Sequence, residues 1–343
     1  MTISDTARPL VAVHGVGRDF DVSKSWLNRV IERTPRQLLK AVDDVTFEIM
    51  RGETLGLVGE SGCGKSTVAR LIVGLYPPSR GRIEFDGNPQ TADAGAWSAD
   101  VRRRMQMIFQ DPYASLNPRW RVAEIVAEPM RAQESASSRQ DQLARVAQLL
   151  TQVGLSPADA RKYPHEFSGG QRQRISIARA LSSSPEFLVC DEPTSALDVS
   201  VQAQILNLMK ELQERLGLTY LFISHNLAVV SQMATRVGVM YLGRIVELVE
   251  SAELFARPQH PYTRMLLDAI PDLEMSGRPR TPVAGEVANP LEPPAGCAFH
   301  PRCPHANERC RIERPELNQW RGLTRVACHA VEEGRIGNAQ HPS

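Results

Sequence analysis

The sequence predicts an α/β fold, because short apolar runs typical of buried parallel strands alternate with stretches of helical periodicity. Residues 53–58, 105–109 and 187–190 are such runs. The first run leads into a loop of the form G-x-x-x-x-G-K-[ST], and a helical stretch follows it. Open parallel sheets bind ligands beyond the carboxyl ends of their strands. We therefore expect a phosphate-binding core with its site along that edge.

The phosphate-binding loop is the most specific motif of the chain. Its glycines let successive backbone N–H groups wrap around an anion, and the helix N-terminus behind it favours negative charge. Lys65 is expected to reach the β- and γ-phosphates of a nucleotide, and the Ser66 hydroxyl to ligate Mg²⁺. The predicted nucleotide contacts of the loop are Gly59, Glu60, Ser61, Gly62, Cys63, Gly64, Lys65, Ser66 and Thr67.

The charge balance and the lengths of the apolar runs bear on whether the protein binds nucleic acid or a membrane. The 40 basic and 39 acidic residues nearly cancel, so no overall field favours nucleic acid or an anionic membrane. The one short basic cluster, residues 102–104, is expected to be a solvated helix face. No apolar run approaches the ~18 residues of a transmembrane helix, and residues 1–8 lack the pattern of a secretory signal. If the protein works at a membrane, other chains must provide the spans.

The remaining elements can be taken in order. Residues 9–58 alternate like strands around a polar insertion at about 22–37, and residues 80–87 predict a strand that ends in a turn. Residues 122–164 carry two apolar helical stripes, which indicates an inserted helical subdomain. An amphipathic helix is expected at 201–216, and a buried strand at 220–224.

Beyond residue 255 strand and helix periodicity fade, and proline and glycine become frequent. We expect a core domain over residues 1–256, with the helical subdomain at about 122–175. A small C-terminal module should cover 257–333, followed by a disordered tail at 334–343.

Four of the six cysteines lie in this C-terminal module. They are Cys297, Cys303, Cys310 and Cys328. A loop-rich module with little apolar core suits a metal staple. Zinc usually favours tight C-x2–4-C pairs, which are absent, whereas all-cysteine ligation at longer spacing suits a [4Fe–4S] cluster. The cluster is favoured, and Zn²⁺ or no metal remain the alternatives. The histidines of the module, His300, His305 and His329, are expected at the surface.

Further polar residues fall at the ends of predicted strands or at helix starts. Gln110, the pair Asp191-Glu192, and His225 each end a strand. The tetrapeptide Ser168-Gly169-Gly170-Gln171 opens a helix. Together with the phosphate loop, and in this order, these elements resemble the ATP-binding subunit of ATP-binding cassette (ABC) transporters over about residues 10–255. The Ser-Gly-Gly-Gln signature is diagnostic of that family among phosphate-loop ATPases.

The resemblance implies a phosphate-loop (RecA-like) ABC ATPase core with an antiparallel β subdomain and an inserted helical subdomain. It also implies ATP and Mg²⁺ as cofactors. Asp191 would hold Mg²⁺ through water, and Glu192 would polarise the attacking water. His225 would contact the γ-phosphate, while Gln110 would sense the metal and the nucleophile. Phe20 is the best match to the aromatic that stacks on adenine; the alternative is a loop residue packed on the local core.

In this family the signature residues Ser168, Gly169, Gly170 and Gln171 serve ATP that is held by another subunit. The resemblance therefore implies a head-to-tail dimer with two ATP molecules at its interface. Residues 195–198 resemble the loop that crosses this interface.

Four further stretches resemble the dipeptide/oligopeptide importer branch (DppF/OppF-like). They are residues 110–118, 163–167, 260–263 and 293–297. The resemblance implies a DppD/OppD-like partner ATPase in a heterodimer, two membrane permeases and an extracytoplasmic solute-binding protein, at the cytoplasmic face of the inner membrane and without nucleic acid. Nickel or glutathione import, or a soluble non-transport ABC ATPase, are the alternatives. Asn226 departs from the branch, which usually has Asp there.

Overall fold

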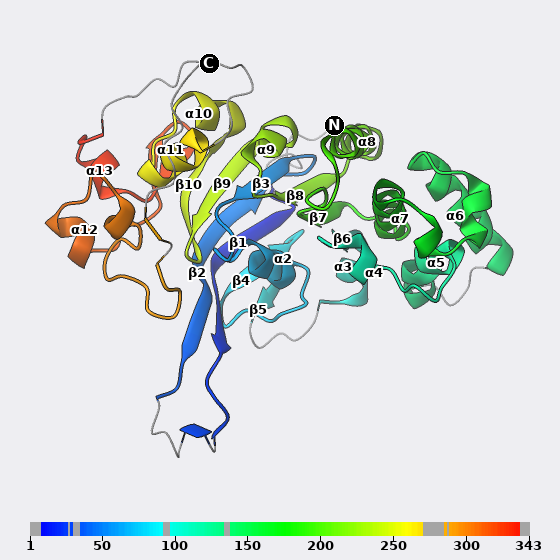
Figure 1. Cartoon of the computed structure of the whole chain (residues 1–343), viewed down its shortest axis with the longest axis horizontal. Helices are drawn as coiled ribbons and strands as arrows, with labels where there is room; N and C mark the ends of the chain where they lie inside the picture. Colours follow the sequence, from blue (N-terminus) through cyan, green and yellow to red (C-terminus); the bar gives the residue numbers. More distant parts are fainter. Residues whose placement is uncertain are drawn as a thin grey trace.

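The computed structural model describes residues 8–26, 28–29, 35–91, 97–133, 138–269, 285–286 and 288–336. Its centre is formed by two sheets (Figure 1). The smaller sheet contains, in spatial order, β2 (Leu38–Ile49), β1 (Val11–Asp21), β4 (Arg80–Phe85) and β5 (Asn88–Thr91). The larger sheet contains β11 (Asn318–Arg321), β12 (Thr324–Val326), β10 (Arg244–Glu250), β9 (Arg236–Tyr241), β3 (Thr54–Val58), β8 (Thr219–Ile223), β7 (Phe187–Asp191) and β6 (Met105–Ile108).

The larger sheet has a parallel core made of β9, β3, β8, β7 and β6. Every residue of β3, β7 and β8 is buried, as expected where helices cover both faces of a parallel sheet. The helices of the core are α2 (Lys65–Ile72), α3 (Ala99–Arg104), α4 (Pro112–Ser115), α8 (Val199–Leu216) and α9 (Leu227–Met233). The α/β class and its parallel strands are therefore confirmed.

The smaller sheet is antiparallel throughout. Asp86 and Gly87, both at positive φ, form the predicted turn, and β5 follows it to make a hairpin. The far ends of β1 and β2 project away from the rest of the molecule (Figure 1). Of the insertion predicted at about 22–37, residues 27 and 30–34 lie outside the described residues.

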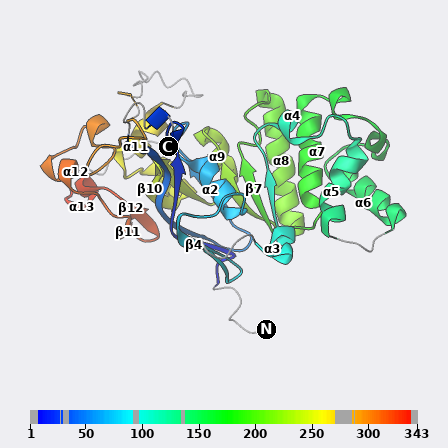
Figure 2. The same cartoon turned by 90° about the horizontal axis from the view of Figure 1, so that it is seen from below.

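The helical subdomain consists of α5 (Val122–Gln133), α6 (Arg139–Gln152) and α7 (Gly169–Leu181). Its apolar stripes meet in one core, where Ile125, Val146, Leu149 and Ile175 are at most 1% exposed. The subdomain lies at the opposite end of the molecule from the C-terminal helices in both views (Figures 1 and 2). The structure thus agrees with the predicted inserted subdomain.

The C-terminal region contains more regular structure than the sequence suggested. Its helices are α10 (Ser251–Ala256), α11 (Pro261–Asp268), α12 (Glu308–Ile312) and α13 (His329–Glu332). The β11–β12 hairpin extends the larger sheet, because β12 pairs with β10 through Glu247 and Leu248. Residues 337–343 of the predicted disordered tail lie outside the described residues. The fading periodicity beyond residue 255 gave no sign of these elements, because a short exposed strand such as β11 carries no apolar alternation.

An ion-pair network joins the two sheets. Arg104 and Arg51 each bind both Asp86 and Glu186, at 2.6–3.0 Å. Hydrogen bonds from Arg104 hold the pKa of both carboxyls below the usual range. The Arg104 side chain is only 17% exposed, so the prediction that residues 102–104 form a solvated face is wrong at this position. No helix in the described ranges is long and apolar enough to cross a membrane.

Candidate nucleotide-binding site

The phosphate loop connects β3 to α2 in a shape that glycine alone permits at two positions. Gly59 has a φ of 151°, and a Cβ there would lie 2.2 Å from the Met240 carbonyl oxygen. Gly64 has a φ of 107°, and a Cβ there would lie 2.3 Å from the Ala41 carbonyl oxygen. Any side chain at these positions would displace backbone, so the loop is held close against its neighbours.

Lys65, the first residue of α2, is buried, and its ammonium group turns back into the loop. Its Nζ donates to the carbonyl oxygens of Gly59 at 2.7 Å and Glu60 at 2.9 Å. Both acceptors are backbone groups of the loop, so these charge-assisted bonds hold the ammonium group within the loop. Burial raises the pKa of the neighbouring Cys63 thiol, which keeps it neutral.

The structure brings the predicted catalytic residues together at one edge of the sheet. The strands β3, β8, β7 and β6 are neighbours, and their carboxyl ends lead into Gly59, His225, Glu192 and Gln110. Glu192 Oε2 accepts a hydrogen bond from Gln110 Nε2 at 3.0 Å and lies 3.1 Å from His225 Nδ1. One carboxylate oxygen therefore connects two other polar side chains.

The pair Asp191-Glu192 differs in burial and backbone conformation. Asp191 is 3% exposed, and burial raises the pKa of its carboxyl, while a hydrogen bond from Ser66 Oγ at 2.9 Å opposes the shift. A hydroxyl beside a carboxylate is a donor set that suits Mg²⁺. Glu192 has a φ of 48°, a strained conformation for this residue that is often found at functional sites.

A cavity of about 490 Å³ connects these residues. Lys65, Ser66, Gln110 and Glu192 line it, and Phe20 lines it as well. Its volume lies in the range of small-molecule sites. Phe20 also packs edge-on against Tyr76, with 5.4 Å between ring centroids. Phe20 thus packs locally and also lies beside the candidate site, while its stacking on adenine stays a prediction.

The signature residues lie elsewhere. Ser168 is the N-cap of α7: its Oγ accepts from the Gln171 N–H at 3.3 Å, and the Gln171 side chain accepts from the Ser168 N–H at 3.0 Å. Gly170 is buried against Val201, with no room for a side chain. Among the described residues that line the cavity, none belongs to the tetrapeptide Ser168, Gly169, Gly170 and Gln171.

The four cysteines share a small volume without forming a metal site. The Cys297 N–H donates to the Cys310 carbonyl oxygen at 2.8 Å, and burial raises the pKa of Cys297, Cys303 and Cys328 to about 11. In the part of the chain that the structure describes, no three His, Cys, Asp or Glu side chains are arranged to hold a metal ion. As placed, these thiols do not fit a [4Fe–4S] cluster or zinc.

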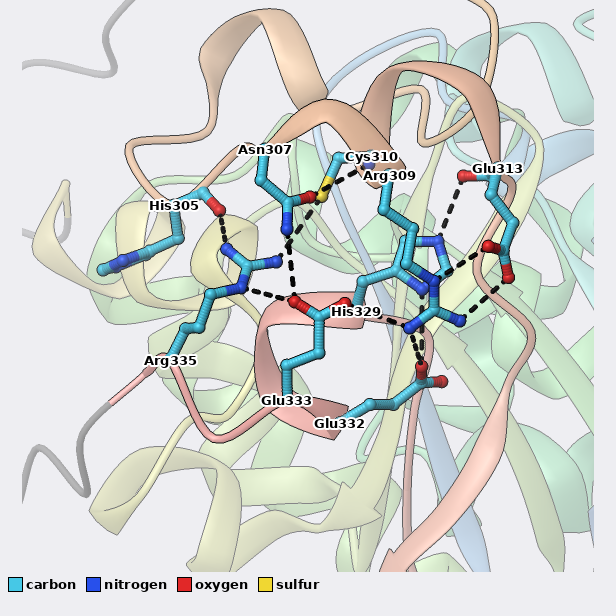
Figure 3. A network of polar contacts seen from close by, with 9 residues as sticks. All are labelled: His305, Asn307, Arg309, Cys310, Glu313, His329, Glu332, Glu333 and Arg335. Carbon is cyan, nitrogen blue, oxygen red and sulfur yellow. Dashed lines mark hydrogen bonds and ion pairs between the residues drawn. The ribbon is translucent and has the colours of Figure 1, made fainter.

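A polar network surrounds Cys310 in the same module (Figure 3). Arg309 pairs with Glu313, Glu332 and Glu333, and Arg335 pairs with Glu333. His329 is 2% exposed and lies between Glu332 and the Glu313 carbonyl oxygen. The expectation that His329 is a surface residue was wrong, because its ring fills the centre of this network.

Sequence reasoning missed Arg302 and the place of Tyr262. Arg302 forms a two-point ion pair with Glu60 of the phosphate loop, and Tyr262 accepts from the Glu60 N–H. Tyr262 lies in a stretch that had only indicated the family branch. The pairing of Arg302 across 242 residues left no local signal in the sequence.

Comparison with known proteins agrees with this geometry. Residues 42–195 match the family model described as ABC transporter, and residues 246–310 match the model of the oligopeptide/dipeptide transporter C-terminal region. A putative oligopeptide transport ATP-binding protein, YkfD of Bacillus subtilis, is 49% identical over 324 residues, covering 94% of this chain and 95% of the relative. The di/tripeptide transport ATP-binding protein DppF of Pseudomonas aeruginosa is 49% identical, covering 86% and 91%.

Among solved structures, the dimeric post-hydrolysis state of the ATP-binding cassette MJ0796 bound to ADP and Pi resembles the chain. It has a TM-score of 0.60 and 28% identity, and the match covers 70% of this chain and 98% of that one. The fold and site thus define an ATP-hydrolysing ABC cassette. The chain belongs to the family of ATP-binding subunits of oligopeptide and dipeptide ABC transporters.

Proposed function

We propose that this chain binds and hydrolyses ATP to power peptide uptake through partner membrane permeases. The observation that carries the ATPase part is the Glu192 carboxylate, placed between Gln110 and His225 beside the phosphate loop. The peptide part rests on the relatives, which are named for oligopeptide and di/tripeptide transport.

The roles follow from the geometry and from the needs of phosphoryl transfer. Lys65 would meet the β- and γ-phosphates. Ser66 and Asp191 would hold Mg²⁺, whose positive charge would offset the charge that develops during phosphoryl transfer. Glu192 orients and polarises the attacking water. His225 contacts the γ-phosphate.

Two further site residues have smaller parts in the proposal. Gln110 would sense both the metal and the water that attacks the γ-phosphate. Phe20 stacks on adenine at the cavity wall. Glu192, Gln110 and the phosphate loop line one cavity, which supports placing their roles in one half of the site.

The other half of the site is proposed to come from a second ATPase. Ser168 and the N-terminus of α7 are exposed and do not line the chain's own cavity, so they are available to the nucleotide of a partner. A solved relative is described as dimeric and bound to ADP and Pi. We propose a head-to-tail heterodimer with a DppD/OppD-like subunit, docked on two permeases at the cytoplasmic face of the membrane and served by a solute-binding protein.

Reconstitution tests the function. The chain, a partner ATPase and two candidate permeases would be placed in vesicles with ATP inside, on the side of the ATPases. Uptake of labelled di- and oligopeptides is expected only with hydrolysable ATP. Nickel and glutathione serve as competing substrates, and transport of either in place of peptides would contradict the peptide assignment while leaving the ATPase intact.

The division of the chain is also proposed: an ATPase domain at 1–256, with the helical subdomain at about 122–175, and a C-terminal module at 257–333. The match to the C-terminal family model begins at residue 246, inside β10. The family-model match therefore begins within the larger sheet, before the proposed boundary at residue 257.

For the four cysteines we propose a [4Fe–4S] cluster, with zinc as the alternative. All four lie in one module, which supports the proposal, but their thiols would have to turn from the positions described. Protein purified without oxygen should be brown, with about four irons per chain. Replacing Cys303 by Ser should remove the colour and leave ATP binding in place. Colourless protein with stoichiometric zinc would establish the alternative, and protein without metal would end both.

A further inference from the structure

Glu60, a variable position of the phosphate loop, is held by all three of its polar groups. Its N–H donates to Tyr262 Oη at 2.9 Å, and its carbonyl oxygen accepts from Lys65 Nζ at 2.9 Å. Its carboxylate accepts two hydrogen bonds from Arg302, at 2.8 and 2.9 Å. Two of these three partners come from the C-terminal region and not from the nucleotide-binding fold.

Arg302 is built into this position. Its side chain is 3% exposed, and its guanidinium lies 5.8 Å from the ring centre of Phe299 and 5.9 Å from that of Tyr241. Tyr262 packs against both rings, at 5.4 Å from Phe299 and 4.7 Å from Tyr241. All three aromatic side chains are at most 2% exposed. A planar guanidinium fixed by packing and by a two-point bond is a rigid anchor.

The anchor has an electrostatic consequence at the phosphate site. Glu60 places a carboxylate in the same loop that must hold the polyphosphate of ATP. Two negative groups within one loop repel each other. The paired Arg302 cancels that charge. It also fixes Glu60, whose backbone carbonyl is one of the groups that Lys65 contacts before ATP arrives.

We propose that Arg302 is a positioning residue for ATP binding, and that through it the C-terminal module sets the affinity of the phosphate loop for MgATP. Arg302 ends a 3₁₀ turn, His300–Arg302, and Cys303 follows directly. This inference rests on the proposed ATP site and concerns its regulation.

The test compares two arginines of the same module. Arg302→Met removes the bond to the loop. Arg309→Met removes an arginine that pairs with Glu313, Glu332 and Glu333, all within the module (Figure 3). MgATP affinity is measured on the full-length chain with a fluorescent ATP analogue, and KM and kcat on the assembled transporter. R302M should weaken binding on the order of tenfold, with kcat at saturating ATP unchanged. R309M should leave the affinity near that of the wild type.

A second pair of variants separates charge from fold. If an uncompensated Glu60 causes the loss, Glu60→Gln combined with R302M should bind ATP more tightly than R302M alone. Arg302→Lys keeps the charge but not the two-point geometry, so its affinity should fall between those of R302M and the wild type. Thermal unfolding identifies any variant that does not fold. If R302M does not fold, the affinities of R302K and of R302K combined with E60Q are compared instead.

Three outcomes would contradict the proposed role of Arg302. Wild-type affinity in folded R302M, equal losses in R302M and R309M, or no recovery in the double variant would overturn the positioning role. If the wild-type chain itself binds no MgATP, the proposed function fails before this inference is reached.

Discussion

The phosphate loop and the signature tetrapeptide, which we propose as the two halves of an ATP site, differ in their contacts. On the phosphate-loop side Lys65, Ser66 and Glu60 all have partners within the chain, and the C-terminal region encloses them. On the signature side Ser168 is exposed, and its side chain bonds to Gln171 of its own capping box. The difference teaches that the phosphate loop is organised by contacts within its own chain, whereas the signature residues leave a polar side chain open, as the proposed contact with a partner requires.

The largest effect is expected from breaking the chemistry of the enclosed half. Glu192→Gln should lower the rate of ATP hydrolysis by about 10²–10⁴-fold, because it removes the carboxylate that polarises water, and ATP binding should remain. Steady-state hydrolysis by the purified transporter, alongside analogue binding, measures both. Glu211→Gln on the exposed face of α8 is the control. Near-normal hydrolysis in E192Q would refute the role of Glu192.

The next effect comes from blocking the exposed half. Ser168→Arg places a bulky cation where the N-terminus of α7 would meet the partner's nucleotide, so hydrolysis at that composite site should fall by roughly 10²–10³-fold. Binding of ATP to the mutated chain's own loop should be spared. Dimers in which one subunit carries the change show which site is lost. A defect that follows the mutated chain's own nucleotide would contradict the head-to-tail arrangement.

A smaller effect should follow from weakening binding on the enclosed side. Lys65→Ala removes the cation of the loop, and a charged hydrogen bond of ~1.5–3 kcal/mol corresponds to a roughly 10–100-fold loss of ATP affinity. The same chain should still present Ser168 to a partner. Titration with a fluorescent ATP analogue measures the loss, and unchanged affinity would exclude Lys65 from phosphate binding.

The smallest effect is expected from weakening the ion-pair network that joins the two sheets. Arg104→Met removes one arginine from the junction with Asp86 and Glu186, and after allowance for solvent screening should cost ~1 kcal/mol of unfolding free energy at pH 7. Both carboxyls have lowered pKa values, so their contribution is present above the ordinary carboxyl pKa and is lost as the pH falls below it. Urea unfolding should show the gap between variant and wild type closing towards pH 3. A gap independent of pH would contradict this assignment.

Much of the fold could be predicted because buried strands and helices have recognisable apolar patterns in the sequence. The strand β7 (Phe187–Asp191) is buried on both sides and reads as an unbroken apolar run, and α5 shows its apolar stripe through Ile125. The strand-end residues Gln110, Glu192 and His225 could be expected to meet because parallel strands share one edge.

Other features could not be predicted because they depend on pairing across long separations. The β11–β12 hairpin is short and largely exposed, and it is a strand pair only because β10 offers an open edge. The contact between Arg302 and Glu60 depends on how the C-terminal region returns to the loop. Arg302 itself is one of many arginines, and nothing in its neighbours distinguishes it.

The order of strands in the larger sheet has a consequence for synthesis of the protein. β3 is the first of its eight strands to be made, yet it lies between β8 and β9, which follow about 160 residues later. At ~5–20 residues per second the ribosome takes many seconds to deliver these neighbours. During that interval β3 is an apolar segment without a partner, and the loop behind it has no Met240 to pack against. A nascent chain can therefore acquire its nucleotide only late in translation, and until then β3 is a natural target for chaperones.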